Sequence, residues 1–147
     1  YDHKVDGSKG TIDMDKINKD LLAFYKYLRD EYPNVQIPYM FCDSAEQTLI
    51  NSIRFFMAKR NIKIAVTDSY KGRINDRIYA LNSLIAQGRF LVLKGCENVI
   101  ESLCLQVWNP KELTEDVRLD DGTVDIDTAD ALEYSFSSFI KYFNLKG

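Results

Sequence analysis

Short apolar runs alternate with longer segments whose apolar residues recur at helical spacing, and this alternation constrains the fold more than any other feature. The runs at residues 39–42, 62–66 and 89–93 are typical of buried strands. Strands that alternate with helices favour an α/β fold with at least some parallel strands. The helical stripes occupy residues 17–28, 49–57, 74–85, 99–107 and 132–143.

Cap and turn residues mark the ends of these segments. Ser44 with Gln47 three residues later is a capping-box pattern, so a helix should begin there. Gly88 predicts the C-terminal stop of the third helix. Helices should also end at Tyr32 and Pro33 and at Asn109 and Pro110, and a small hairpin should close at Asp121 and Gly122.

The net charge of −3 by itself argues against a nucleic-acid partner, but the charge is unevenly distributed. Residues 59–94 carry eight basic and two acidic side chains, a balance of +6, whereas residues 95–135 carry two basic and eleven acidic ones, a balance of −9. A basic stretch next to an acidic one suits a metal-dependent enzyme that acts on an anion. Solvated helix faces would give the same pattern.

Cysteine and histidine usage argues against several classes of site. The spacing of Cys42, Cys96 and Cys104 fits no zinc site, redox motif or disulfide framework. His3 is the only histidine, so catalysis through a Ser–His or Cys–His pair is not expected. No apolar run has the length of a membrane span, and 147 residues suit a single domain over residues 1–147.

Asp43 directly follows the apolar run at residues 39–42 and precedes a predicted helix. In open α/β sheets, ligands bind at the carboxyl ends of the strands, so this carboxylate can point into a cleft. The alternative is an acid that accepts free N–H groups where a helix begins. The sequence leaves both interpretations open.

Asp127 and Asp130 lie three residues apart where the last helix begins, which places both carboxylates on one helix face. Carboxylates are the hard oxygen ligands that Mg²⁺ and Mn²⁺ prefer. With a strand-end acid they could bind the metal ions of a phosphoryl-displacement site. In the alternative, Asp127 is the helix N-cap and Asp130 is a first-turn acid favoured by the helix dipole.

The segment at residues 69–73 (SYKGR) joins a predicted strand to a predicted helix and carries Lys71, Gly72 and Arg73. Backbone N–H groups and these two cations could hold phosphates. The segment lacks the glycine spacing and the Lys-Ser/Thr ending of a P-loop. A polar turn is the alternative interpretation.

Three segments, residues 41–46 (FCDSAE), 69–74 (SYKGRI) and 127–134 (DTADALEY), appear in an order and spacing that resembles a known family. Together they resemble the C-terminal nuclease domain of phage terminase large subunits, closest to the PBSX-like group. Residues 1–5 (YDHKV) also resemble the end of an early strand in that family. The resemblance covers nearly the whole chain.

The resemblance implies a ribonuclease H-like fold, a mixed sheet flanked by helices. It implies metal-dependent endonucleolytic cutting of concatemeric viral double-stranded DNA during head packaging, in the host cytoplasm. The implied partners are the portal, the small terminase subunit and the ATPase domain of the full protein. It further implies that the first strands and the first catalytic Asp lie upstream of Tyr1, so that this chain would be a truncated nuclease domain with reduced or no activity alone.

The resemblance also implies roles for individual side chains. Asp43 matches the family's active-site acid at the end of the central strand, and Asp130 matches its acid on the last helix. Asp127 stands where the family often has a histidine, and it would be a further ligand or would orient a water molecule. Together they would hold one or two Mg²⁺ or Mn²⁺ ions.

Lys71, Arg73 and Arg77 would hold the DNA backbone, a type of contact that does not read base sequence. Two other classes remain open. One is a non-catalytic interaction domain, in which the acids are caps and the basic stretch binds a partner. The other is a receiver-like domain with Asp43 as phosphoacceptor and Lys94 after a later strand.

Overall fold

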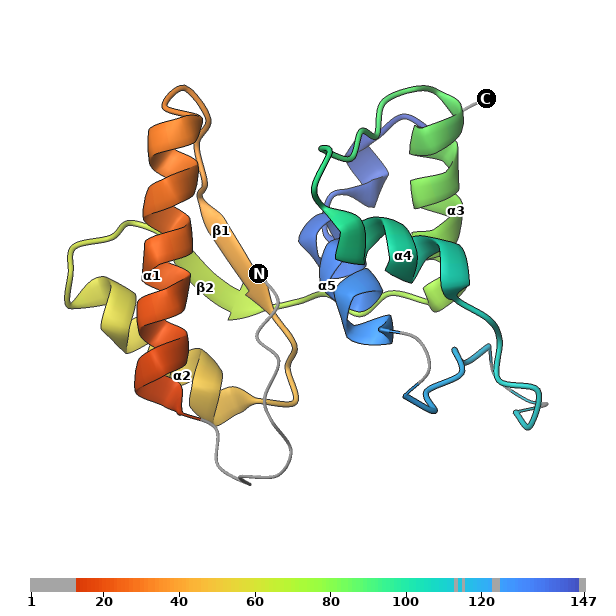
Figure 1. Ribbon diagram of the computed structural model, residues 1–147, viewed down its shortest axis with the longest axis horizontal. Coiled ribbons are helices and arrows are strands. Elements are labelled where there is room, and N and C mark those ends of the chain that lie inside the picture. The colour runs from red at the N-terminus through yellow and green to blue at the C-terminus, as the bar shows by residue number, and fades with distance from the viewer. Residues whose placement is uncertain (1–12, 113, 115, 123–124, 146–147) are drawn as a thin grey trace. The chain divides into compact units, whose positions relative to one another are not determined.

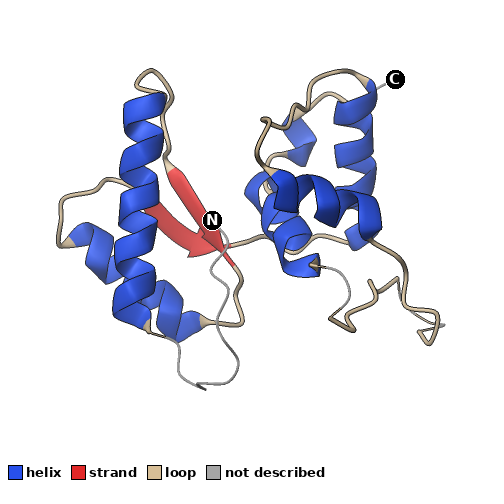
Figure 2. Cartoon of the chain, in the orientation of Figure 1, coloured by secondary structure: helices blue, strands red, loops and turns tan. Residues whose placement is uncertain are grey.

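The structure is a computed structural model that describes residues 13–112, 114, 116–122 and 125–145. It divides into two compact units, unit 1 (Tyr1–Asp68) and unit 2 (Ser69–Gly147). The described residues form five α-helices, a short 3-10 helix and a two-stranded parallel sheet (Figures 1 and 2), which confirms the mixed α/β class. The early strand expected at residues 1–5 lies outside the described residues, and the single domain expected over residues 1–147 stays a prediction.

None of the helices in the described part of the chain is both long and apolar enough to cross a membrane.

Unit 1 begins with a long helix whose ends agree with the sequence. Asp13 is its N-cap, and its carboxylate accepts the backbone N–H of Lys16 at 3.0 Å. Tyr32 is its C-cap, as predicted from Tyr32 and Pro33. The elements of unit 1 are α1 (Met14–Glu31), β1 (Tyr39–Cys42), α2 (Gln47–Ala58) and β2 (Ala65–Asp68).

The turn that precedes α2 differs from the predicted capping box. The helix begins at Gln47, and the carboxylate that accepts a backbone N–H there belongs to Asp43, whose Oδ1 lies 2.9 Å from the Ala45 nitrogen. The side-chain amide of Gln47 reaches back to the Ser44 carbonyl at 3.0 Å. The helix start predicted at Ser44 is therefore wrong, because a separate turn intervenes between strand and helix.

The two strands lie side by side in parallel (Figure 1), with Met40 opposite Val66 and Cys42 opposite Asp68. Alternate strand residues share a face, so Met40 and Cys42 both point toward the helices. Leu21 of α1 also packs against the core that results. The buried members of this core are Ile50, Ile53, Met57 and Val66.

Polar contacts join the helices of unit 1 to each other and to the sheet. The Asn18 amide of α1 donates to the Ser52 hydroxyl of α2 at 2.9 Å. Arg54 of α2 donates from Nε and Nη2 to the Val66 carbonyl, at 3.2 and 3.0 Å. The strand predicted at residues 62–66 is shifted, because β2 begins at Ala65 and ends at Asp68. Ile62 and Ile64 pack against the core without joining the ladder.

Unit 2 confirms the stop predicted at Gly88. This residue has a φ of +65°, its N–H bonds the Ile85 carbonyl at 3.0 Å, and the Arg89 N–H bonds the Leu84 carbonyl at 2.9 Å. These two bonds form a Schellman motif, in which glycine suits the left-handed conformation. The elements of unit 2 are α3 (Ile74–Ala86), α4 (Glu97–Leu105), α5 (Ile126–Ser137) and the 3-10 helix η1 (Ile140–Tyr142).

The strand predicted at residues 89–93 is wrong. The segment has no ladder partner among the described residues, and its side chains at Leu91 and Leu93 are 85% and 63% exposed. The final helix is also shorter than predicted, since α5 ends at Ser137 and a 3-10 turn follows.

Among the described residues one antiparallel bridge forms in the segment after α4, and the hairpin predicted at Asp121 and Gly122 stays a prediction, since residues 123–124 lie outside the described part of the chain. The bridge pairs Trp108 with Arg118, and the Leu119 N–H bonds the Val107 carbonyl at 2.9 Å. The chain therefore reverses direction between Trp108 and Arg118. The predicted helix end at Asn109 and Pro110 is wrong, because α4 ends at Leu105 before this bridge.

Candidate functional site

Asp43 lies where the sequence placed it, after β1, and its side chain is exposed. Asp68, the last residue of β2, lies opposite Cys42 at the same edge of the sheet. The Oδ1 atom of Asp68 accepts a hydrogen bond from the Gln47 amide at 3.1 Å. Sequence reasoning missed Asp68, although an Asp-Ser pair ends both apolar runs, at residues 43–44 and 68–69.

At this edge of the sheet, the surroundings of Cys42 change the pKa of its thiol. Burial, and then the negative charge of Asp68, raise the pKa of its thiol. Both causes favour the protonated thiol, so Cys42 acts as a small core residue, as its position in the apolar run indicates.

The start of α5 is capped by Asp125, not by Asp127. The Asp125 carboxylate accepts the Thr128 N–H at 3.0 Å and the Thr128 hydroxyl at 2.7 Å. Asp127 is an exposed acid of the first turn. The N-cap alternative for Asp127 is therefore wrong. The N-cap of α5 is Asp125, two residues earlier in the chain.

Asp130 is held by two arginine side chains. Its Oδ1 atom accepts a hydrogen bond from Arg118 Nη1 at 2.6 Å and lies 3.5 Å from Arg77 Nη1. Its Oδ2 atom lies 3.5 Å from the Tyr134 hydroxyl. The Asp130 side chain is 31% exposed, so it reaches solvent while it is held from within.

Glu133, one turn after Asp130 on α5, completes this group, which we call the buried charge cluster: Arg77, Arg118, Asp130 and Glu133. Glu133 is 1% exposed, pairs with Arg118 Nη2, and has Oε2 at 3.3 Å from Arg77 Nη1. Each arginine is 6% exposed. Two cations and two anions balance, which is what burial of charges requires.

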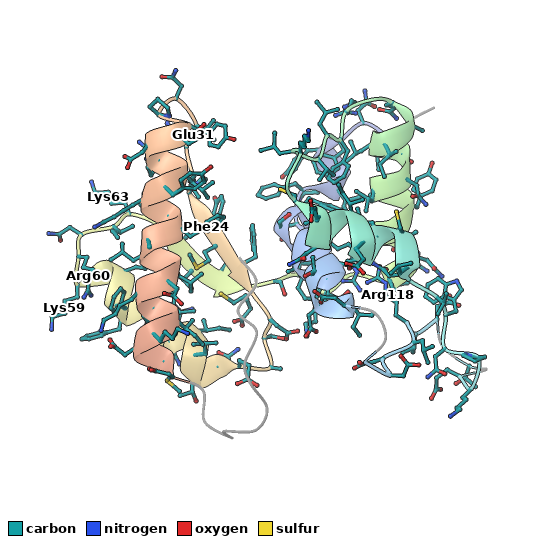
Figure 3. The ribbon with its side chains drawn as sticks, in the orientation of Figure 1. Phe24, Glu31, Lys59, Arg60, Lys63 and Arg118 are labelled. Carbon is teal, nitrogen blue, oxygen red and sulfur yellow. The ribbon has the colours of Figure 1, made fainter. Side chains whose placement is uncertain are left out.

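Sequence reasoning missed the buried charge cluster. Arg118 lies in a segment that reads as acidic and irregular, and Figure 3 labels it among the residues of unit 2. The signal that could have identified the cluster is Arg77, because it falls between Ile74 and Leu81 at helical spacing, on the apolar stripe of α3.

The three cations expected to hold DNA have different surroundings. Arg77 is buried and faces Asp130 and Glu133, with its guanidinium 5.1 Å from the Tyr134 ring centroid. Lys71 and Arg73 are exposed. Arg73 pairs with Asp76 at 3.0 Å, and this hydrogen bond raises the pKa of the guanidinium. Two of the three side chains are thus exposed, and the third is buried against acids.

A further basic group lies in unit 1, at the end of α2 and in the residues that follow. Lys59, Arg60 and Lys63 are all exposed there (Figure 3), and Arg60 stacks on the Phe56 ring with 3.5 Å between the guanidinium and the centroid. They belong to the basic stretch at residues 59–94, but they are not among the cations predicted from the sequence to hold DNA.

The donor chemistry of the predicted acids suits a hard divalent cation, because all three are carboxylates. Asp43 belongs to unit 1, and Asp127 and Asp130 belong to unit 2. Among the residues that the structure describes, no three His, Cys, Asp or Glu side chains gather closely enough to hold a metal ion.

The chain matches no known protein family, no curated protein and no solved structure. Its likeness to the terminase nuclease domain therefore stays a prediction from the sequence.

Proposed function

We propose that this chain is a metal-dependent endonuclease domain of the terminase large-subunit type, with a ribonuclease H-like fold. Its substrate would be concatemeric viral double-stranded DNA in the host cytoplasm. The portal, the small terminase subunit and an ATPase domain would be its partners during packaging.

The observation that carries this proposal is the position of Asp130. The Asp130 carboxylate of α5 is held by the buried guanidinium groups of Arg77 and Arg118 and still reaches solvent. Asp127 lies on the same helix face, outside the N-cap position. Asp43 supports the proposal from the other unit, because it is an exposed acid at the carboxyl end of a parallel strand.

In this proposal Asp43, Asp127 and Asp130 bind one or two Mg²⁺ or Mn²⁺ ions. The ions would supply charge stabilisation for the reacting phosphate and a lowered pKa for the attacking water. Lys71 and Arg73 would bind the DNA backbone, which predicts little sequence preference and binding that weakens steeply with salt.

The test is Mn²⁺ binding by isothermal titration calorimetry, together with an assay of plasmid nicking. Asp43→Asn and Asp130→Asn should each weaken Mn²⁺ binding and abolish nicking. Asp30→Asn, an exposed acid of α1, is the matched control and should change neither. Unchanged binding and nicking in both site variants would rule out the assignment.

One observation favours a second candidate, a non-catalytic interaction domain. Asp130 is already paired with Arg118 and Arg77, so its charge can serve the fold alone. In that case the wild-type chain binds no Mn²⁺ in the same titration. The receiver-like alternative loses the strand that should precede Lys94, since residues 89–93 form none.

A further inference from the structure

We propose that three exposed cations at the end of α2 and just after it, Lys59, Arg60 and Lys63, form a DNA-binding surface that contacts phosphates of the duplex backbone. We call them the α2 cation group. The inference rests on the proposed function for its partner, double-stranded DNA, but it needs no metal ion and none of the predicted acids. It adds a surface in unit 1 to the contacts predicted at Lys71 and Arg73.

The chain segment that carries these cations contains no acid. Residues 47–67 include four basic side chains and no Asp or Glu. One of the four, Arg54, is used within the fold, because it donates to the Val66 carbonyl. The other three are exposed, and no acid among the described residues pairs with Lys59 or Lys63. The α2 cation group therefore presents positive charge to solvent.

Neighbouring charges leave this positive charge in place. On α1, Lys19 lies near Arg60, but it pairs with Asp15 at 2.5 Å, and the two charges of that pair balance. The dipole of α2 favours cations at its C-terminal end, and this effect falls off within the last turn. It can account for Lys59 and Arg60, but Lys63 lies beyond the helix.

The Arg60 side chain is oriented by contacts within α2. Its guanidinium stacks on the Phe56 ring, 3.5 Å from the centroid, and its Nη1 donates to the Phe56 carbonyl at 3.1 Å. The Phe56 ring in turn packs against the core of unit 1. A side chain that is ordered before binding loses less rotamer entropy on binding. Because a guanidinium carries five N–H donors, others remain for a phosphate.

The turn after α2 fixes the backbone between the cations. Asn61 adopts a φ of +56°, and the Ile62 N–H bonds the Met57 carbonyl at 3.1 Å, as in a Schellman motif. Ile62 also packs against the core. Figure 3 shows the three labelled side chains of the α2 cation group on the same side of unit 1. They are thus carried by a helix end and a hydrogen-bonded turn.

The chemistry of this surface fits a phosphate backbone better than a membrane. Phe55 is 72% exposed and lies four residues before Lys59, but the apolar face of α2 is buried in the core of unit 1. A helix that lies on a bilayer needs that face for the lipid. Duplex DNA needs only surface cations, which neutralise phosphates and release counterions.

The experiment measures binding of a short fluorescein-labelled DNA duplex by fluorescence anisotropy, over a series of salt concentrations, on the 147-residue chain and on K59Q/R60Q/K63Q. EDTA is present, so that no divalent ion takes part. Each phosphate contact contributes about 0.9 to the slope of log affinity against log salt, so the variant should lower the magnitude of this slope by about 2–3. The dissociation constant at low salt should rise about tenfold or more.

The matched control is K26Q/K111Q/K141Q, which removes three exposed cations elsewhere in the chain and changes the net charge by the same amount. It should change the slope by less than about 1. Equal losses in the two triple variants would mean that net charge alone attracts the duplex, and would overturn the proposal. An unchanged slope in K59Q/R60Q/K63Q would overturn it as well.

Circular dichroism establishes whether K59Q/R60Q/K63Q is folded. If it is not, K59Q/K63Q replaces it, because this variant leaves Arg60 on the Phe56 ring, and the slope should then fall by about 2. The wild-type slope in folded K59Q/K63Q would overturn the proposal.

Two further probes represent other partners. Tighter binding of a labelled polyglutamate peptide than of the duplex would overturn the proposal in favour of an acidic protein. Sedimentation with phosphatidylserine vesicles that is lost in K59Q/R60Q/K63Q, while duplex binding is kept, would overturn it in favour of a membrane.

Failure of the proposed function has a different signature. If the wild-type chain binds no Mn²⁺ and nicks no plasmid, but its duplex binding is lost in K59Q/R60Q/K63Q, the nuclease proposal falls and the α2 cation group stands. If Asp43→Asn and Asp130→Asn abolish nicking and K59Q/R60Q/K63Q binds the duplex as the wild type does, the proposed function stands and only this surface is lost. A wild-type chain that binds no duplex overturns the surface outright.

Discussion

Both units of the chain bury apolar side chains, but among the described residues only unit 2 also buries charged ones. Unit 1 has an apolar core of Ile50, Ile53, Met57 and Val66. In unit 2 the buried side chains include Glu133, whose carboxylate contacts the guanidinium groups of both Arg77 and Arg118. Apolar burial stabilises by about 25 cal/mol per Å² with no directional requirement. Buried ions stabilise only when their partners are in place.

From this difference we expect the two units to tolerate different substitutions. Unit 1 should accept any apolar side chain of similar volume. Unit 2 should resist the loss of a single charge, even where the replacement fits the space. Hydrogen exchange measured by mass spectrometry can test this contrast, because it reports on peptides of each unit separately.

The largest expected effect is that of Glu133→Ala. It leaves the guanidinium groups of Arg77 and Arg118 with Asp130 as their remaining acid, and breaking a buried ion pair in this way costs about 3–5 kcal/mol. Urea unfolding should show the loss, with faster exchange in peptides of unit 2. Glu133→Gln keeps the volume and one acceptor oxygen, so it should cost less. A loss under about 1 kcal/mol in the alanine variant would contradict the contrast between the units.

The next effect is the cavity left by Met57→Ala in unit 1. Met57 is 1% exposed, and truncation of such a side chain costs about 2–5 kcal/mol. Faster exchange should appear in peptides of α2 and β2. Met57→Leu keeps the volume, so its cost should stay below about 1.5 kcal/mol. An equal loss in both variants would mean that the core of unit 1 is as selective as the buried charge cluster.

The helix caps provide a matched pair across the two units. Asp13→Ala removes the cap of α1, and Asp125→Ala removes the cap of α5, each at a cost of about 1 kcal/mol in urea unfolding. Asp125 should cost more, because its carboxylate accepts both the N–H and the hydroxyl of Thr128. Asparagine at either position keeps an acceptor oxygen and should restore most of the loss. A larger loss at Asp13 would reverse the expected order.

The smallest expected effect concerns alkaline pH. The pKa of Cys42 is raised in the folded chain, so folded molecules keep the thiol proton to a higher pH than unfolded ones. The free energy of unfolding is thus unaffected by this group below the unfolded thiol pKa of about 8.5. It falls as the pH rises through the folded pKa. Urea midpoints at pH 7 and pH 9.5 should show a smaller decline in Cys42→Ala, and equal declines would contradict this.

The sequence predicted those parts of the fold that depend on neighbours along the chain. The apolar stripes located the five helices, and Asp43 was expected after a strand, where it lies. Gly88 ends α3 because its left-handed backbone is a local requirement. Such features depend on only a few consecutive residues, so they can be predicted from the sequence.

The sequence could not predict features that depend on distant partners. The run at residues 89–93 has strand composition, but a strand also needs a second backbone to pair with, and the described part of the chain offers none to this run. The contact of Arg118 with Asp130 and Glu133 likewise joins residues 12 and 15 positions apart, across a loop whose path no periodicity specifies. For the same reason, the acids expected to share a metal site stay a hypothesis.

The contact of Arg54 with the Val66 carbonyl also has a consequence for association between molecules. N–H and C=O groups on the open side of a strand are a template on which another chain can add by backbone pairing. At Val66 that acceptor already receives two hydrogen bonds from one guanidinium, so an incoming strand would have to displace Arg54 first. A side chain that fastens a helix to its sheet thereby also protects β2 from aggregation.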